Sequence, residues 1–137
     1  MNSIFSLLLS FFLSPVATNY SLEVSVSNVP TNKGNVFVGL YRTKDAWPEF
    51  GQQFKGKIVQ AEKGTTKIVF ENLPEGTYAL AVYHDENKNG VLDKNLVGMP
   101  TEVYGFSNNA RRTFSAPTFE EAKFNIQKDT KHTIWIK

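Results

Sequence analysis

The stretch that decides the fold is TYALAVYH, residues 77–84. Side chains alternate between the two faces of a strand, so positions 78, 80 and 82 share one face and positions 79, 81 and 83 share the other. Both sets are apolar or aromatic, whereas a strand with one solvated face alternates apolar and polar residues. The stretch therefore predicts a central β-strand that is covered on both faces.

Shorter segments on either side of this stretch also have strand character. Residues 20–28 and 36–41 place valines and leucines on one face. Further strand patterns fall at residues 54–61, 65–71, 124–126 and 133–136. About seven short strands with little helical periodicity predict an all-β fold, a seven-stranded antiparallel β-sandwich, with a small barrel as the alternative. The open edges of such a sandwich could pair between chains.

One long segment lacks strand patterns. It runs from His84 to about Ala122 and is rich in Gly, Asn and aromatic residues. Loops of this length in a small domain are usually functional or disordered, and this composition favours an ordered loop. Near its end, Thr118 and Glu121 have the spacing of a capping box, which predicts one short helical turn.

The composition limits the class of protein. The chain has 137 residues, enough for one domain with a core, and it has no cysteine for disulfides or thiolate metal sites. The formal net charge is +2, and its basic residues are scattered. A nucleic-acid surface needs a basic stripe, so we expect no nucleic-acid partner.

The N-terminal segment differs from the rest. No charged side chain occurs before Glu23, and residues 4–13 form an almost continuous apolar run. Such a run has the length of the apolar part of a signal peptide and is short for a bilayer span. We predict a signal peptide at 1–17, a single β-sandwich domain at 18–137, export, and no transmembrane segment in the mature chain. A buried strand or an uncleaved anchor is the alternative.

The segment after the central strand has the spacing of a calcium loop. Oxygen ligands at positions 1, 3, 5, 7 and 9, with glycine at position 6, are typical of such loops. Position 12 is a bidentate Glu in an EF-hand, but here it is Leu96, and a strand precedes the loop. We therefore expect a structural Ca²⁺ site on a β-scaffold, completed by water, Asn95 or Glu102. The alternative is a metal-free Asx turn. The predicted ligands are Asp85, Asn87, Asn89, the Val91 carbonyl and Asp93.

Two further segments are candidates for ligand contact. Carbohydrate sites combine aromatic faces with amide hydrogen bonds, which the loop at 104–111 offers. The alternative is that its aromatic residues pack on the sandwich edge and its asparagines form a turn. A tryptophan beside proline, as at 47–48, either stacks on a sugar or packs its own loop down. The possible ligand-facing residues are Trp47, Tyr104, Asn108, Asn109 and Arg111.

Support for catalysis is thin. His84 stands beside Asp85 and Glu86, and a histidine beside carboxylates can act as a general base. The only other histidine is His132, and no nucleophile motif is present. We assign no catalytic residue and expect His84 to hold the loop.

Several segments together form a recognisable set: LPEGTY (73–78), ALAVYHDEN (79–87), NG (89–90), LD (92–93), GMP (98–100), Glu102, YGFSNNA (104–110) and APTFEEAKF (116–124). The combined segments closely resemble the domain-of-unknown-function 2141 family. Its members are small exported bacterial proteins, and the resemblance covers nearly all of the mature chain. It implies a periplasmic or secreted location and a transthyretin- or prealbumin-like sandwich. An immunoglobulin-like sandwich is the alternative that the strand pattern itself leaves open. It implies no established activity.

Three functions remain open from the sequence. The first is a non-catalytic module that binds an envelope protein or a glycan. The second is a purely structural envelope protein without a ligand. The third is a hydrolase or lyase that uses His84 and the neighbouring carboxylates.

Overall fold

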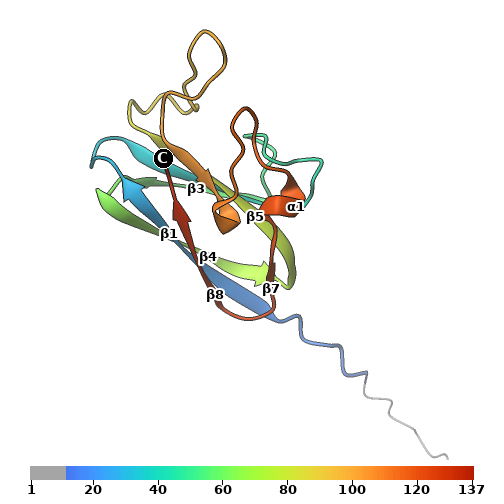
Figure 1. The fold of residues 1–137 in the computed structure, drawn as a ribbon. Coiled ribbons are helices and arrows are strands. Elements are labelled where there is room, and N and C mark those ends of the chain that lie inside the picture. Colours follow the sequence, from blue (N-terminus) through green and yellow to red (C-terminus); the bar gives the residue numbers. More distant parts are fainter. Residues whose placement is uncertain (1–11) are drawn as a thin grey trace, which may run out of the picture.

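Two β-sheets pack face to face in the computed structural model, of which we describe residues 12–137 (Figure 1). The apolar run at 4–13, on which the predicted signal peptide rests, lies outside the described residues up to position 11. The strands are β1 (Asn19–Val29), β2 (Asn35–Tyr41), β3 (Lys55–Gln60), β4 (Gly64–Pro74), β5 (Gly76–Asp85), β6 (Tyr104–Phe106), β7 (Phe124–Ile126) and β8 (Thr130–Trp135).

The smaller sheet has the strand order β4-β1-β8, and the larger has the order β3-β2-β5-β6, with β7 also paired to β5. The prediction of an all-β fold is confirmed. The prediction of antiparallel pairing throughout is wrong at one place, because β1 and β8 run parallel. The sequence predicts seven strands, and the one that it does not predict is β6, which lies inside the predicted long loop. Its three residues are too few for an alternating pattern to be recognised.

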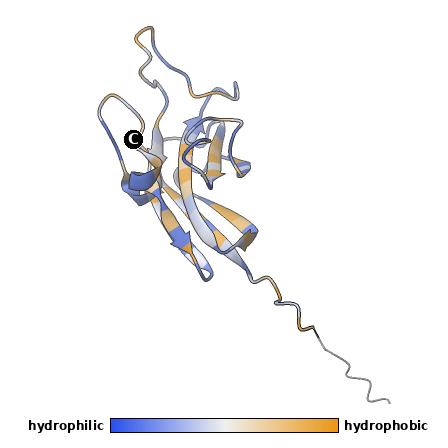
Figure 2. Ribbon diagram, turned by 90° about the vertical axis from the view of Figure 1, so that its right-hand side faces the viewer, coloured by the Kyte–Doolittle hydropathy of each residue, from blue (hydrophilic) through white to orange (hydrophobic). Residues whose placement is uncertain are grey.

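Strand β5 is central and buried on both faces, as its sequence predicts. Its neighbours are β2, β6 and, at its first residues, β7. Tyr78, Leu80 and Val82 face the main core between the sheets, where they meet the apolar residues of β1, β2, β4 and β8. In Figure 2 hydrophobic segments alternate with hydrophilic ones along the strands.

The outer face of β5 has a second apolar cluster. Ala79 and Ala81 are its small members on the strand, and larger side chains from the loops cover them, including Trp47 and Phe119. The covering elements are the segment after β2 and α1 (Phe119–Ala122). The predicted helical turn is confirmed: Thr118 and Glu121 form a capping box at its start.

One side of the sandwich is sealed where β6 meets the residues after β8. The amide of Tyr104 donates to the Lys137 carbonyl at 3.4 Å, and the amide of Lys137 donates to the Tyr104 carbonyl at 3.1 Å. A Cβ at Gly105 would lie 2.8 Å from the Trp135 carbonyl, so only glycine allows this close approach. Among residues 12–137, no helix is long and apolar enough to span a membrane.

Candidate binding cleft and acidic loop

The loop that follows β5 begins at a buried carboxylate. Asp85 is 5% exposed. Its Oδ1 accepts a hydrogen bond from the amide of Asn89 at 3.2 Å, and its Oδ2 accepts one from the amide of Gly90 at 2.8 Å. Asp85 therefore holds the turn by both oxygens, and Gly90 adopts the positive φ of 78° that the turn needs.

The next polar side chains of the loop converge on Asp93. The side-chain amides of Asn87 and Asn89 donate to the two Asp93 oxygens at 2.6 and 2.5 Å. Their Oδ1 atoms accept from backbone amides two residues further on, at 3.2 and 3.1 Å. The hydrogen bonds from Asn89 and Asn87 hold the pKa of Asp93 below its ordinary value.

A third carboxylate reaches the loop from further along the chain. Glu102 Oε2 accepts a hydrogen bond from the backbone amide of Asp93 at 3.1 Å. Burial raises the pKa of Glu102, and the nearby charges of Asp93 and Asp85 add to this. Of the two side chains proposed to complete the ion site, Glu102 thus lies at the loop. Asn95 instead accepts from the amides of Val97 and Met99 in a separate turn.

The donor set of the loop is suited to a hard cation. Carboxylate and amide oxygens are the ligands that Ca²⁺ prefers, and no softer ligand stands among the predicted positions. In residues 12–137 no three His, Asp or Glu side chains are gathered in the close arrangement of a metal site. The amide groups of Asn87 and Asn89 turn their nitrogens toward Asp93, so a cation there requires each amide to rotate and present its oxygen.

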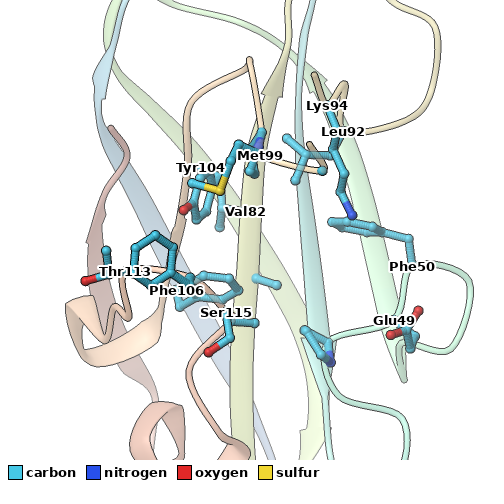
Figure 3. Close-up of a pocket in the computed structure, with 16 residues that line it drawn as sticks. Glu49, Phe50, Val82, Leu92, Lys94, Met99, Tyr104, Phe106, Thr113 and Ser115 are labelled. Carbon is cyan, nitrogen blue, oxygen red and sulfur yellow. The ribbon is translucent and has the colours of Figure 1, made fainter. Parts of the chain in front are cut away.

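The same loop continues into one wall of a cleft of about 290 Å³ on the outer face of the larger sheet (Figure 3). The floor comes from β5 and β6, and the other walls come from the segments at 48–50 and 113–116. Aromatic and aliphatic side chains dominate, with Lys94 extending toward Phe50. The main lining side chains are Glu49, Phe50, Leu92, Lys94, Met99, Pro100, Tyr104, Phe106, Thr113, Phe114 and Ser115.

Of the five residues predicted to face a ligand, Tyr104 lines this cleft. Trp47 is only 8% exposed, and its Nε1 donates to the Pro117 carbonyl at 2.8 Å. Its ring packs edge-on against Tyr41 and Phe106, at centroid distances of 5.3 and 5.5 Å. Trp47 thus packs its loop onto the sheet and offers no face for stacking on a sugar.

The polar residues of the 104–111 loop bind other parts of the chain. The Asn108 side-chain amide donates to the Glu121 and Lys123 carbonyls, at 3.2 and 2.8 Å. Asn109 Oδ1 accepts from the Trp135 amide at 2.9 Å. These contacts hold the loop against α1 and β8, with both asparagines at positive φ in a turn.

Arg111 also has internal partners. Its guanidinium donates to the Lys137 carbonyl at 2.6 Å and lies 4.4 Å from the centre of the Tyr104 ring. Arg111 therefore holds the Tyr104 ring in place, and this ring lines the cleft. Arg111 and Asn109 line a separate hollow beside the exposed Trp135, away from the cleft.

His84 occupies a structural position. It is 1% exposed, and its Nε2 lies 2.6 Å from the Lys33 carbonyl, to which it donates. Sequence reasoning missed Met99 and Phe114 of the cleft, although exposed apolar residues in a polar loop are an available signal.

A comparison with protein families gives one match. The profile of DUF2141, described as an uncharacterised protein conserved in bacteria, matches residues 24–134. Neither the curated proteins nor the solved structures contain a match to this chain. The matched residues run from β1 to β8 and include the acidic loop and all residues that line the cleft. The resemblance predicted from the sequence is therefore confirmed, and the chain belongs to the bacterial DUF2141 family.

Proposed function

We propose that this protein is an exported, non-catalytic binding module of the bacterial envelope, with residues 18–137 as its single domain. Its ligand site is the cleft on the outer face of the larger sheet, and a structural Ca²⁺ holds one wall of that cleft. The type of sandwich, transthyretin-like or immunoglobulin-like, stays a prediction that a strand-by-strand comparison with an experimental structure tests.

One observation carries the proposal. The acidic turn at 85–93 contains Leu92 and runs without a break into Lys94 and Met99, and all three residues line the cleft. Whatever fixes the turn therefore fixes the wall. A loop that is placed by a rigid scaffold is a common location for a binding site.

Calcium acts in this proposal through charge and order. The ion neutralises Asp85 and Asp93, and Glu102 is available as a third carboxylate from outside the turn. Because the ligands come together only in the folded chain, binding to the folded state also stabilises the fold.

The lining of the cleft favours a glycan as the ligand. A sugar ring has an apolar face and a rim of hydroxyl groups. The rings of Tyr104, Phe106 and Phe114 match the face, and the hydroxyls of Thr113 and Ser115 match the rim. An apolar segment of an envelope protein is the second occupant that such a cleft could take.

Thermal melting tests the ion. Added Ca²⁺ is expected to raise the melting temperature of the wild type relative to EDTA, and Mg²⁺ is expected to do so less. Asp93→Ala removes this shift, while Asp45→Ala, an exposed carboxylate in another loop, keeps it. Equal melting in Ca²⁺ and EDTA, with no metal bound by native mass spectrometry, contradicts the calcium part of the proposal.

The methyl group of Met99 reports on the cleft. The sequence has two methionines, and only Met99 lies within 18–137, so a ¹³C-methyl label gives one signal. A glycan selected on an array is expected to shift that signal, and Tyr104→Ala is expected to abolish the shift. Trp135→Ala, an exposed aromatic residue on another face, leaves it unchanged. If no glycan on the array moves the signal, the ligand is not a glycan of that set, and the structural envelope role gains support.

A further inference from the structure

The side of the sandwich opposite the sealed one has two strand edges. The smaller sheet ends at β4 and the larger sheet ends at β3. Strand β4 has eleven residues, Gly64–Pro74, so its edge is long. A long edge presents unpaired amides and carbonyls that can pair with another chain, and proteins usually block such edges.

Two lysines reach across from β3 to this edge. Lys55 Nζ donates to the Glu71 carbonyl at 3.1 Å, and Lys57 Nζ donates to the Val69 carbonyl. Both lysines lie on the inward face of β3, since they share it with Val59, which packs on the core. Charged residues that point inward on an edge strand are a known device against strand addition.

The stem of Lys57 also covers the rim of the core. In the β2–β3 register, Lys57 is opposite Val38, a core residue, and its Nζ lies 5.8 Å from the centre of the Phe70 ring. Further along, a hollow of about 450 Å³ lies between the edges, and Lys67 of β4 is one of the residues that line it. Its lining includes Gln60 of β3 and Thr65 of β4. Lys55 and Lys57 thus make the hydrogen bonds that cover the β4 edge on this side.

The β4 edge is complementary in charge to itself. The carbonyls of Val69 and Glu71 face the lysines of β3 and not β1. In an antiparallel pair, every second residue of a strand directs its amide and carbonyl to the same side, so the main-chain groups of Lys67 also face away from β1. If two β4 strands pair antiparallel about Val69, Lys67 of one lies opposite Glu71 of the other, and the reverse. Opposite charges on paired strands stabilise an antiparallel pair.

The exposed side chains fit this arrangement. Val69 is 37% exposed and lies on the symmetry axis of the pair. Lys67 is at the outer face, where its Nζ is 3.9 Å from Glu23 of β1, a contact that leaves it largely exposed. An isologous contact of this kind closes as a dimer, because each copy uses the same patch.

We propose that Lys55 and Lys57 block strand addition at the β4 edge. When these lysines turn away or are replaced, the β4 edge binds a second copy of this chain. The two β4 strands then pair antiparallel through Lys67, Val69 and Glu71, which joins the two smaller sheets into one.

The first experiment removes the ammonium groups and keeps the apolar stems. The K55M/K57M variant is expected to double its molar mass with rising concentration in sedimentation equilibrium, while the wild type stays monomeric. The control K44M/K128M removes two exposed lysines at other places and is expected to stay monomeric. Backbone amides of Lys67, Val69 and Glu71 are expected to become protected from hydrogen exchange only in K55M/K57M.

The second experiment tests the register by reversing charges. In the K55M/K57M background, E71K places two lysines opposite each other and is expected to abolish the dimer. Adding K67E restores the opposite charges and is expected to restore the dimer. Association through any other surface is not corrected by this exchange.

Two results overturn the proposal. One is a K55M/K57M variant that melts cooperatively and stays monomeric. The other is a dimer that E71K does not weaken, or that K67E does not restore. If the double variant does not fold, the single variant K57M, which keeps the Lys55 contact, serves in its place. None of these measurements involves calcium or a glycan, so they stand apart from the proposed function.

Discussion

The two long sides of the sandwich differ in the groups that join the sheets there: main-chain groups on one side and side chains on the other. On the β6 side, the main chains of Tyr104 and Lys137 bind each other directly, and Asn109 holds the Trp135 amide. On the β3 side, the hydrogen bonds between β3 and β4 in the described part of the chain come from the side chains of Lys55 and Lys57.

The difference concerns what must move to open each side. The β6 side opens only if strands separate, because backbone groups make its contacts. On the β3 side, the β4 edge becomes accessible when two long, flexible and partly hydrated side chains rotate away. We therefore expect the first side to govern stability and the second to govern association.

The largest effect is expected from matched glycine substitutions. Gly105→Ala places a Cβ 2.8 Å from the Trp135 carbonyl and 3.0 Å from Ile134, which are parts of the sealed side. Overpacking of this kind costs about 1–3 kcal/mol of unfolding free energy. Gly56→Ala on β3 meets the flexible end of Gln53 at 3.1 Å, so its cost is expected to be smaller. Urea unfolding of both variants measures the difference, and an equal loss in both contradicts the distinction between the sides.

Acidification is expected to weaken the sealed side next. The backbone amide of Asn108 donates to His132 Nε2 at 3.1 Å, which requires a neutral ring. Burial lowers the pKa of His132 below its ordinary value of 6.5. The unfolded chain then binds a proton more readily than the folded one, so stability is full above pH 6.5 and falls as the pH drops through the folded pKa. Denaturant unfolding across this range measures the loss. The same pH dependence in His132→Gln assigns the effect to other groups.

The smallest effect is expected at the open side. Lys57→Met removes the hydrogen bond to the Val69 carbonyl but keeps the stem beside Phe70. The carbonyl stays accessible to water, so the unfolding free energy is expected to change by less than about 0.5 kcal/mol at low protein concentration. A loss as large as that of Gly105→Ala shows that the lysines carry stability after all.

Some of the fold follows directly from local sequence. The two apolar faces of TYALAVYH predict a central strand because alternation is a local property, and the capping box predicts α1 for the same reason. Strand β6 has three residues, which is too short for alternation to be recognised. The parallel pairing of β1 and β8 depends on the route of the chain between the sheets, which no local pattern records.

The site divides in the same way. The hydrogen bonds of Asp85, Asn87 and Asn89 to nearby amides follow from the spacing of Asx residues over a turn. The cleft does not, because three loops separated in sequence build it. The sequence leaves two roles open for Trp47. Its contacts with Tyr41 and the Pro117 carbonyl in the folded chain place it in the interior.

The parallel pair of β1 and β8 has a mechanical consequence. The register runs from Leu22 opposite Thr130 to Ser27 opposite Trp135, so the chain enters at one pole of the sandwich and leaves at the other (Figure 1). A force that pulls these two poles apart loads the bonds between β1 and β8 in shear, all at once. In a hairpin the same bonds would open one after another. Strands β1 and β8 thus form a shear-loaded pair that resists tension along the long axis of the domain.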